Sequence, residues 1–272
     1  MTVTREPIWD DAPRSKAQGV FRAIVGVLSA MGRTLQILLS SAAALPYVCL
    51  RASARSELVH QLYVTGIRTL PVISVVAFFI GMILALQVGL ELRRFNQEVY
   101  LGSAVMISLV REMGPFSCAL CLAACVGSAI AAEIGSMKVN DEIAALEIMS
   151  ISPIRFLAAP RILALVLMAP LLAFYCSVVG AMGGGLVGVT QLSVSFGQYM
   201  ASAVSIVDVK DLYVGLCKAL VFGGVIGSVS VSEGFSAHLG ATGVGKATQR
   251  SVIICFLLIL VFGYMITRMC YR

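Results

Sequence analysis

Three charged side chains lie inside long apolar stretches, where a charge needs a specific partner. Arg111 and Glu112 come about ten residues from the outer end of one stretch, and Lys218 about six from that of another, so their depths are similar at about 1.5 Å per residue. Because an unpaired charge in the bilayer costs at least about 2.5 kcal/mol, we expect Glu112 to pair with Lys218 and Arg111 to face a polar cavity or headgroup. The cluster could have a functional role or only fix helix register.

A second group of charges lies in the polar stretch that follows, at Asp141, Glu142 and Glu147. Acidic side chains cannot stay in hydrocarbon, so this stretch must lie at a membrane surface, within reach of a soluble partner. We expect a short helix there with Asn140 as its N-cap and an apolar stripe at helical spacing, formed by Val139, Ile143 and Leu146. This pattern favours a docking surface over a solvated loop without a partner.

The composition indicates which elements hold these residues. Of 272 residues, 59% are hydrophobic and only 12% are charged, which is too little polar surface for a water-soluble domain of this size. Apolar blocks of membrane-spanning length lie at about 70–90, 101–132, 156–189, 212–231 and 251–266. We therefore predict an all-α fold, a polytopic membrane helical bundle with about five transmembrane helices in a domain over residues 69–272.

Residues 1–68 are different, because they carry eight Lys and Arg interleaved with apolar residues. This pattern predicts a basic amphipathic helix lying along the lipid headgroups. The excess of positive charge before the first span places the N-terminus in the cytoplasm. Residues 133–155 and 233–250 then lie on the cytoplasmic side, and residues 91–100 and 191–211 on the outer side.

Glycines recur every four residues inside the predicted spans, as in Gly180, Gly184 and Gly188. Other examples are Gly127, Ala131 and Gly135, and Gly223 with Gly227. Such stripes of small residues let helices approach closely, which predicts a compact bundle.

Two motifs suggest a nucleotide site and a metal site, but their residues fit neither. Residues 240–246 read Gly-Ala-Thr-Gly-Val-Gly-Lys like a phosphate-binding loop, but Ala247 stands where a Ser or Thr should hold magnesium. We expect these glycines to form a tight cytoplasmic turn before a last helix that starts at Ser251. Cys118, Cys121 and Cys125 lack His or acidic companions in an apolar helix, so we predict no metal site.

Longer motifs carry a resemblance to a known family. They are Arg111-Glu-Met-Gly-Pro115, Val126-Gly-Ser-Ala-Ile-Ala-Ala-Glu-Ile-Gly-Ser-Met-Lys-Val139, Glu142-Ile-Ala-Ala-Leu-Glu147, Ser152-Pro-Ile-Arg155, Pro160-Arg161 and Gly240-Ala-Thr-Gly-Val-Gly-Lys-Ala-Thr248. Over about residue 62 to the carboxyl terminus, the chain strongly resembles the MlaE/YrbE-type permeases.

The resemblance implies the permease subunit of an ABC transporter complex that moves phospholipid or a related lipid between membranes and so maintains lipid asymmetry. Its expected partners are a cytoplasmic ABC ATPase that binds ATP and Mg, an MCE-domain lipid-binding protein and a second copy of the chain, in the inner membrane. No nucleic acid is expected, and the chain itself needs no cofactor. The ATPase would dock on a coupling helix at about 138–150, with contacts at Glu133, Lys138, Asp141, Glu142 and Glu147.

The resemblance also implies a lipid cavity, whose matching positions are Leu84, Leu92, Phe95, Arg111 and Glu112, with Lys218 nearby. Where the family usually has Gly-Arg before the Val-Gly of the second span, this chain has Ala124-Cys125, which removes an intramembrane cation. Arg93 and Arg94 at the outer end of the first span could meet lipid phosphates instead. Ser152 and Ala144 replace commonly acidic residues of the docking region.

Two other classes of protein stay open at this point. A secondary transporter would use Glu112 as a proton or ion carrier, and needs an inverted repeat or broken helices. An intramembrane enzyme acting on lipid would have only Arg111, Glu112 and Lys218 as candidate catalytic residues. Because no nucleophile with a matching base is evident in the sequence, we predict a transport subunit and not an enzyme.

Overall fold

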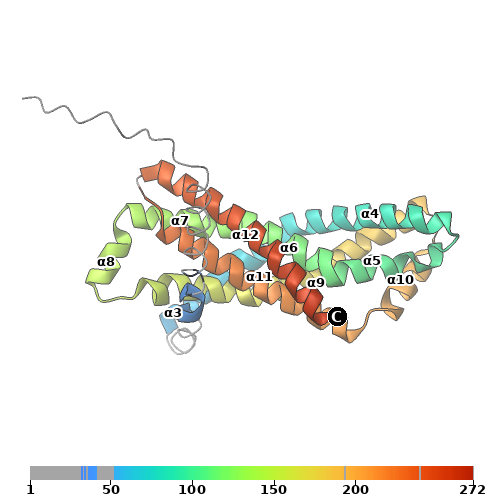
Figure 1. Ribbon diagram of the computed structural model, residues 1–272, viewed down its shortest axis with the longest axis horizontal. Coiled ribbons are helices and arrows are strands. Elements are labelled where there is room, and N and C mark those ends of the chain that lie inside the picture. Colours follow the sequence, from blue (N-terminus) through green and yellow to red (C-terminus); the bar gives the residue numbers. More distant parts are fainter. Residues whose placement is uncertain are drawn as a thin grey trace, which may run out of the picture.

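The computed structural model describes residues 32, 34, 36–41, 52–192, 194–238 and 240–271, and this part of the chain is helical without strands (Figure 1). It contains five helical segments long and apolar enough to cross a membrane. They are Arg55–Arg94, Glu98–Val139, Ile154–Gln191, Val209–Phe235 and Gly240–Cys270. The predicted all-α fold with five spans is confirmed, and each helix continues beyond its apolar block.

The first span is longer than expected at its start. Helix α3 (Ala52–Gly66) continues through the 3₁₀ turn η1 (Ile67–Thr69) into α4 (Leu70–Arg94). The Thr69 hydroxyl donates to the Thr65 carbonyl at 2.6 Å, which keeps this junction helical. The boundary expected at residue 68 therefore falls within a continuous run of helix. Most of the predicted amphipathic segment lies outside the described residues.

The second and third spans contain π-helical turns. The second consists of η2 (Glu98–Tyr100), α5 (Leu101–Ser108), η3 (Leu109–Met113), α6 (Gly114–Leu122), η4 (Ala123–Gly127) and α7 (Ser128–Val139). The third consists of η5 (Ile154–Ala158) and α9 (Ala159–Gln191). The short helix α8 (Glu142–Ile148) joins these spans at one end of the bundle (Figure 1). Ala124 and Cys125 are exposed in η4.

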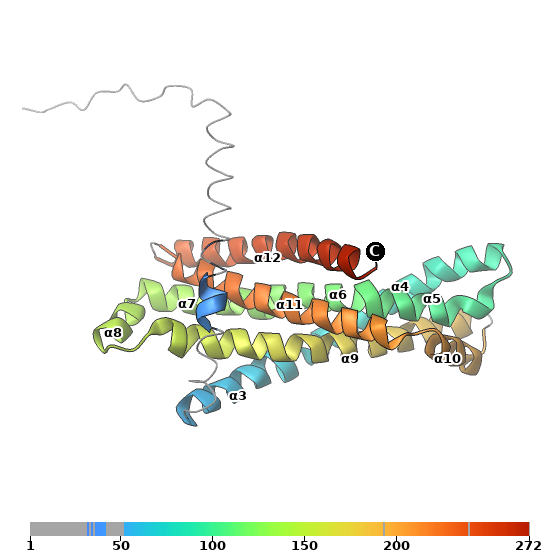
Figure 2. The ribbon, with the colours of Figure 1, turned by 60° about the horizontal axis from the view of Figure 1, so that its bottom comes forward.

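Helix α11 (Val209–Phe235) forms the centre of the bundle, and α12 (Gly240–Cys270) lies at its edge (Figure 2). The most apolar part of α11 is 78% buried, whereas that of α12 is only 17% buried. Helix α9 packs against both α4 and α11. The bundle is thus built around α9 and α11.

Small residues bring these helices together, as the glycine stripes predicted. A Cβ atom on Gly81 of α4 would lie 1.8 Å from the Gly180 carbonyl oxygen of α9. A Cβ on Gly223 of α11 would lie 2.6 Å from the Leu165 carbonyl oxygen of α9. At both places a larger residue would force two backbones apart.

The expected outer loop at 191–211 contains a helix that the sequence analysis missed, α10 (Phe196–Ser205). The Ser195 hydroxyl accepts a hydrogen bond from the Gln198 amide at 3.3 Å and caps this helix. Tyr199 is completely buried and donates to the Ala181 carbonyl at 3.1 Å. Burial raises the pKa of Tyr199 to about 12. The spacing Ser195-x-x-Gln198 was the available signal, since it matches a capping box.

The predicted turn at residues 240–246 is wrong, because α12 begins at Gly240 and not at Ser251. Among the three glycines of this stretch, only Gly240 has a positive φ, at 67°. Gly243 is needed for packing, since a Cβ there would clash with the His238 carbonyl. Contacts of this first part of α12 with α7 outweigh the weak helix propensity of glycine, which is about 1 kcal/mol per residue.

Candidate functional site

A π-helical turn in the second span frees a backbone carbonyl. Pro115 has no amide hydrogen, so the Arg111 carbonyl four residues earlier lacks its usual helical donor. The chain widens there into η3, and the Gly114 amide donates to Leu109 instead. The Lys218 Nζ of α11 donates to the freed Arg111 oxygen at 2.8 Å. The proline thus creates an acceptor that a buried cation satisfies.

The expected pair between Glu112 and Lys218 is confirmed. Lys218 Nζ lies 2.5 Å from Glu112 Oε1, and the Lys218 side chain is only 1% exposed. The same carboxylate oxygen accepts a hydrogen bond from the Thr267 hydroxyl of α12 at 2.6 Å. This contact brings the second, fourth and fifth spans to one point.

Arg111 has a protein partner that was not predicted, and its facing a polar cavity or headgroup stays a prediction. Its Nε and Nη2 donate to the two carboxylate oxygens of Asp211 at 2.8 and 2.9 Å, a bidentate ion pair. Asp211 is in the first turn of α11, because that helix begins at Val209 and not after the predicted outer loop. The Tyr271 hydroxyl also donates to Asp211, at 2.6 Å, and Arg111 stacks 4.6 Å from the Tyr271 ring centre.

The two ion pairs form one charged cluster with a buried side and an accessible side. Lys218 and Asp211 are 1% and 3% exposed, while Arg111 and Glu112 are 38% and 40% exposed. Burial together with the Asp211 carboxylate raises the pKa of Tyr271, so this hydroxyl stays a donor. The charged cluster can hold three spans in register and present opposite charges to a polar ligand.

Three members of this cluster were not predicted from the sequence: Asp211, Thr267 and Tyr271. Signals were available, because Asp211 and Lys218 are seven residues apart on one helical face. Thr267 and Tyr271 are four residues apart on the last helix. Placing the last two residues required knowing that α12 lies against the second and fourth spans.

The other predicted lipid-cavity residues lie apart from the charged cluster. Leu84 and Leu92 are partly buried against the core around Tyr199, and Phe95 is 73% exposed. Arg93 and Arg94 are exposed and pair with neighbouring carboxylates of Glu98 at 3.5 Å and Glu91 at 3.2 Å. A lipid cavity joining these residues to Arg111, Glu112 and Lys218 stays a prediction.

Helix α8 buries its apolar side and exposes its acidic side, as predicted. Ile143 is 3% exposed and anchors it, whereas Asp141, Glu142 and Glu147 are exposed. The predicted N-cap is wrong by one residue: Asp141 caps α8, with φ of 58°, without a side-chain hydrogen bond. Ile148 is 84% exposed and Met149 is 61% exposed, so the outer face of α8 offers apolar as well as acidic groups.

Glu133, predicted to contact an ATPase, pairs within the chain. Its Oε1 lies 2.7 Å from Nη2 of Arg161, whose side chain is 4% exposed. Arg161 also donates to the Leu157 carbonyl at 3.0 Å. Lys138 is exposed. The Glu133–Arg161 pair connects α7 to α9 beside α8, and Arg161 was not anticipated.

Five apolar spans, glycine-mediated helix packing and an acidic helix across one end define a polytopic integral membrane protein. The family model described as Permease MlaE matches residues 58–269, so the chain belongs to the MlaE permease family. A probable ABC transporter permease protein of Rickettsia typhi is 38% identical over 217 residues, covering 80% of this chain and 84% of the relative.

Two further relatives extend this result to other bacteria. The intermembrane phospholipid transport system permease protein MlaE of Haemophilus influenzae is 35% identical over 77% of this chain and 81% of its own. A probable ABC transporter permease protein of Synechocystis is 30% identical over 78% of this chain and 81% of its own. The chain is therefore an ABC transporter permease.

Proposed function

We propose that this permease moves phospholipid between membranes and is driven by a separate ATPase that docks on α8. The substrate named for the Haemophilus influenzae relative supports the lipid assignment. The observation that carries the docking assignment is the surface of α8, which is fixed through Ile143 but leaves its acidic groups exposed.

The geometry suggests how a movement of the ATPase could be transmitted from α8 to the charged cluster. Helix α8 connects the second span directly to the third, and the Glu133–Arg161 pair ties these spans together next to it. Closure of an ATPase pair would push on α8 and tilt α7 and α9 as a unit. Arg111 and Glu112 of the charged cluster lie in η3 of the second span, which α6, η4 and α7 connect to α8, so this tilt would change their contacts.

The proposal includes a setting and partners. The permease would act as a homodimer in the inner membrane, with its N-terminus and α8 in the cytoplasm. An MCE-domain protein would exchange lipid with it on the opposite side. ATP and Mg would be held by the ATPase, so this chain needs no cofactor of its own.

Co-purification tests the docking assignment. The chain is co-expressed with a candidate ABC ATPase from the same organism, and Asp141→Asn, Glu142→Gln and Glu147→Gln are combined in one variant. We expect the ATPase to purify with the natural chain and to be lost from the variant, since exposed charges steer protein association. The control combines Glu91→Gln, Glu98→Gln and Asp208→Asn, which are remote from α8. Equal recovery of the ATPase with both variants would contradict the assignment.

A further inference from the structure

A polar cavity of about 290 Å³ lies between the end of α11 and the start of α12. Glu233, Lys246 and Arg250 line it. Glu233 is only 6% exposed, and no ion pair joins its carboxylate to another of the described residues. The cavity thus brings one carboxylate and two cationic side chains together, so it can receive a group that carries both signs of charge.

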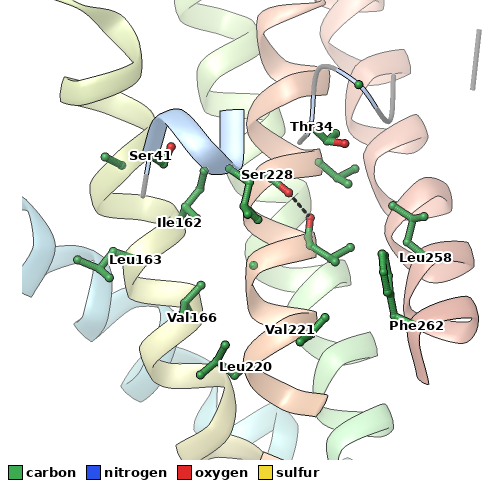
Figure 3. A pocket seen from close by; sticks show the side chains of 16 residues that line it. Thr34, Ser41, Ile162, Leu163, Val166, Leu220, Val221, Ser228, Leu258 and Phe262 are labelled. Carbon is green, nitrogen blue, oxygen red and sulfur yellow. Dashed lines mark hydrogen bonds between the residues drawn. The ribbon is translucent and has the colours of Figure 1, made fainter. Parts of the chain in front are cut away.

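An apolar groove of about 750 Å³ lies along the same two helices (Figure 3). Helix α11 forms its floor, and α9 and α12 form its walls. Val229 of the groove is one turn from Glu233, and Leu258 is two turns from Arg250. Charged cavity and groove are therefore successive parts of one surface.

The groove also contains an unused hydrogen-bond donor. Ser41, from the helical residues 36–41 that lie across the groove, is 5% exposed, and its hydroxyl has no partner among the described residues. The Ser228 hydroxyl, by contrast, donates to the Val225 carbonyl at 3.1 Å. A ligand that brings an acceptor to Ser41 would satisfy this buried group.

We propose that the cavity and groove bind a phospholipid with an ethanolamine headgroup. Glu233 receives the ammonium group, Lys246 and Arg250 receive the phosphate, and an acyl chain fills the groove. An ester carbonyl of the lipid accepts from Ser41. Two other occupants fit less well. A lipid with a net negative headgroup has no cationic group to pair with Glu233. A second copy of the chain that packed on the groove by apolar contacts would also leave this carboxylate unpaired.

This site is separate from the charged cluster at Arg111 and Lys218, because it lies at the end of the bundle near α8. A Cβ on Gly135 of α7 would lie 3.4 Å from Val244, which places the start of α12 beside the helix leading into α8. The inference goes beyond the proposed function. Only its assignment of the site to the cytoplasmic side of the membrane rests on the proposed function.

Lipid binding to the full purified chain in detergent, followed by native mass spectrometry, tests the proposal without ATP or an ATPase. The probes are phosphatidylethanolamine and phosphatidylglycerol with identical acyl chains. We expect phosphatidylethanolamine to bind about tenfold more tightly, and Glu233→Gln to remove this preference without weakening phosphatidylglycerol. Combining Lys246→Gln with Arg250→Gln should weaken both lipids.

The controls are Glu91→Gln and the double variant Arg55→Gln with Arg68→Gln, which remove matching charges elsewhere and should leave the preference unchanged. Leu258→Trp gives a second readout, because this partly exposed side chain lines the groove and a larger one would fill it, so the variant should weaken both lipids. Equal affinity of the natural chain for the two lipids, or an unchanged preference in Glu233→Gln, would overturn the proposal. Failure of ATPase-driven transport would not affect this measurement.

Discussion

Lys218 donates to both the Arg111 carbonyl at 2.8 Å and the Glu112 carboxylate at 2.5 Å, so one buried ammonium group serves a neutral and an ionic acceptor. The first acceptor exists because Pro115 withdraws an amide hydrogen from the second span. The second is a charge that would otherwise be unpaired within a span. Position 218 thus links a backbone irregularity to the charged cluster.

Replacing Lys218 by Met should destabilise the protein strongly. Glu112 would lose its ionic partner and the Arg111 carbonyl its donor, at a cost of roughly 3–5 kcal/mol, as for other broken buried ion pairs. Thermal unfolding in detergent measures the loss. Lys210→Met is the matched control, because this exposed lysine only approaches the Tyr271 ring at 5.6 Å and should cost at most about 1 kcal/mol. Equal losses for the two variants would disprove the role of Lys218.

The sequence predicted those features that depend on long apolar blocks or on charges inside them. Five spans and the Glu112–Lys218 pair follow from composition and from the depth of each charge along its helix. The exposed acidic face of α8 follows from the spacing of Ile143 among carboxylates. These predictions held because lipid imposes the same cost wherever a charge or an open backbone group occurs.

Other features depended on helix ends and on helices distant in sequence. Asp211 was assigned to a loop because its charge interrupts the apolar block, yet α11 begins two residues earlier. Arg161 lies near the start of the third span and finds Glu133 only once α7 and α9 are placed together. The helical start of α12 was missed because glycines suggest a turn, whereas packing against α7 favours helix.

Tyr199 should make stability depend on pH under alkaline conditions. Its folded-state pKa of about 12 lies above the ordinary value near 10, so the protonated form is favoured in the folded protein. This contribution is fully present below about pH 10 and is lost as the pH rises toward about 12. Tyr199→Phe should reduce the decline in unfolding temperature over that interval, and should cost about 1 kcal/mol at neutral pH through the lost hydrogen bond. An unchanged alkaline decline would contradict the prediction, with exposed Tyr100→Phe as the control.

Substitutions of two isoleucines on opposite faces of α8 should distinguish the anchoring of this helix on the bundle from its docking to an ATPase. Ile143 is 3% exposed, so Ile143→Ala should loosen α8 and speed amide hydrogen exchange over residues 142–148. Ile148 is 84% exposed, so Ile148→Ala should leave exchange and unfolding unchanged but weaken ATPase recovery in co-purification. If Ile148→Ala retained the ATPase fully, the apolar part of the docking surface would lie elsewhere.

The contact between α4 and α9 makes a sharp prediction about glycine. A Cβ on Gly81 would meet backbone atoms of Gly180 that no side-chain rotation can move away, so Gly81→Ala must push the helices apart. We expect a loss of about 1 to 3 kcal/mol, measured by unfolding in detergent. Gly245→Ala is the matched control, because its Cβ would meet nothing within 4 Å and alanine favours the helix by about 1 kcal/mol. The two substitutions should therefore change stability in opposite directions, and a stable Gly81→Ala would mean that the α4–α9 contact is not held by this glycine.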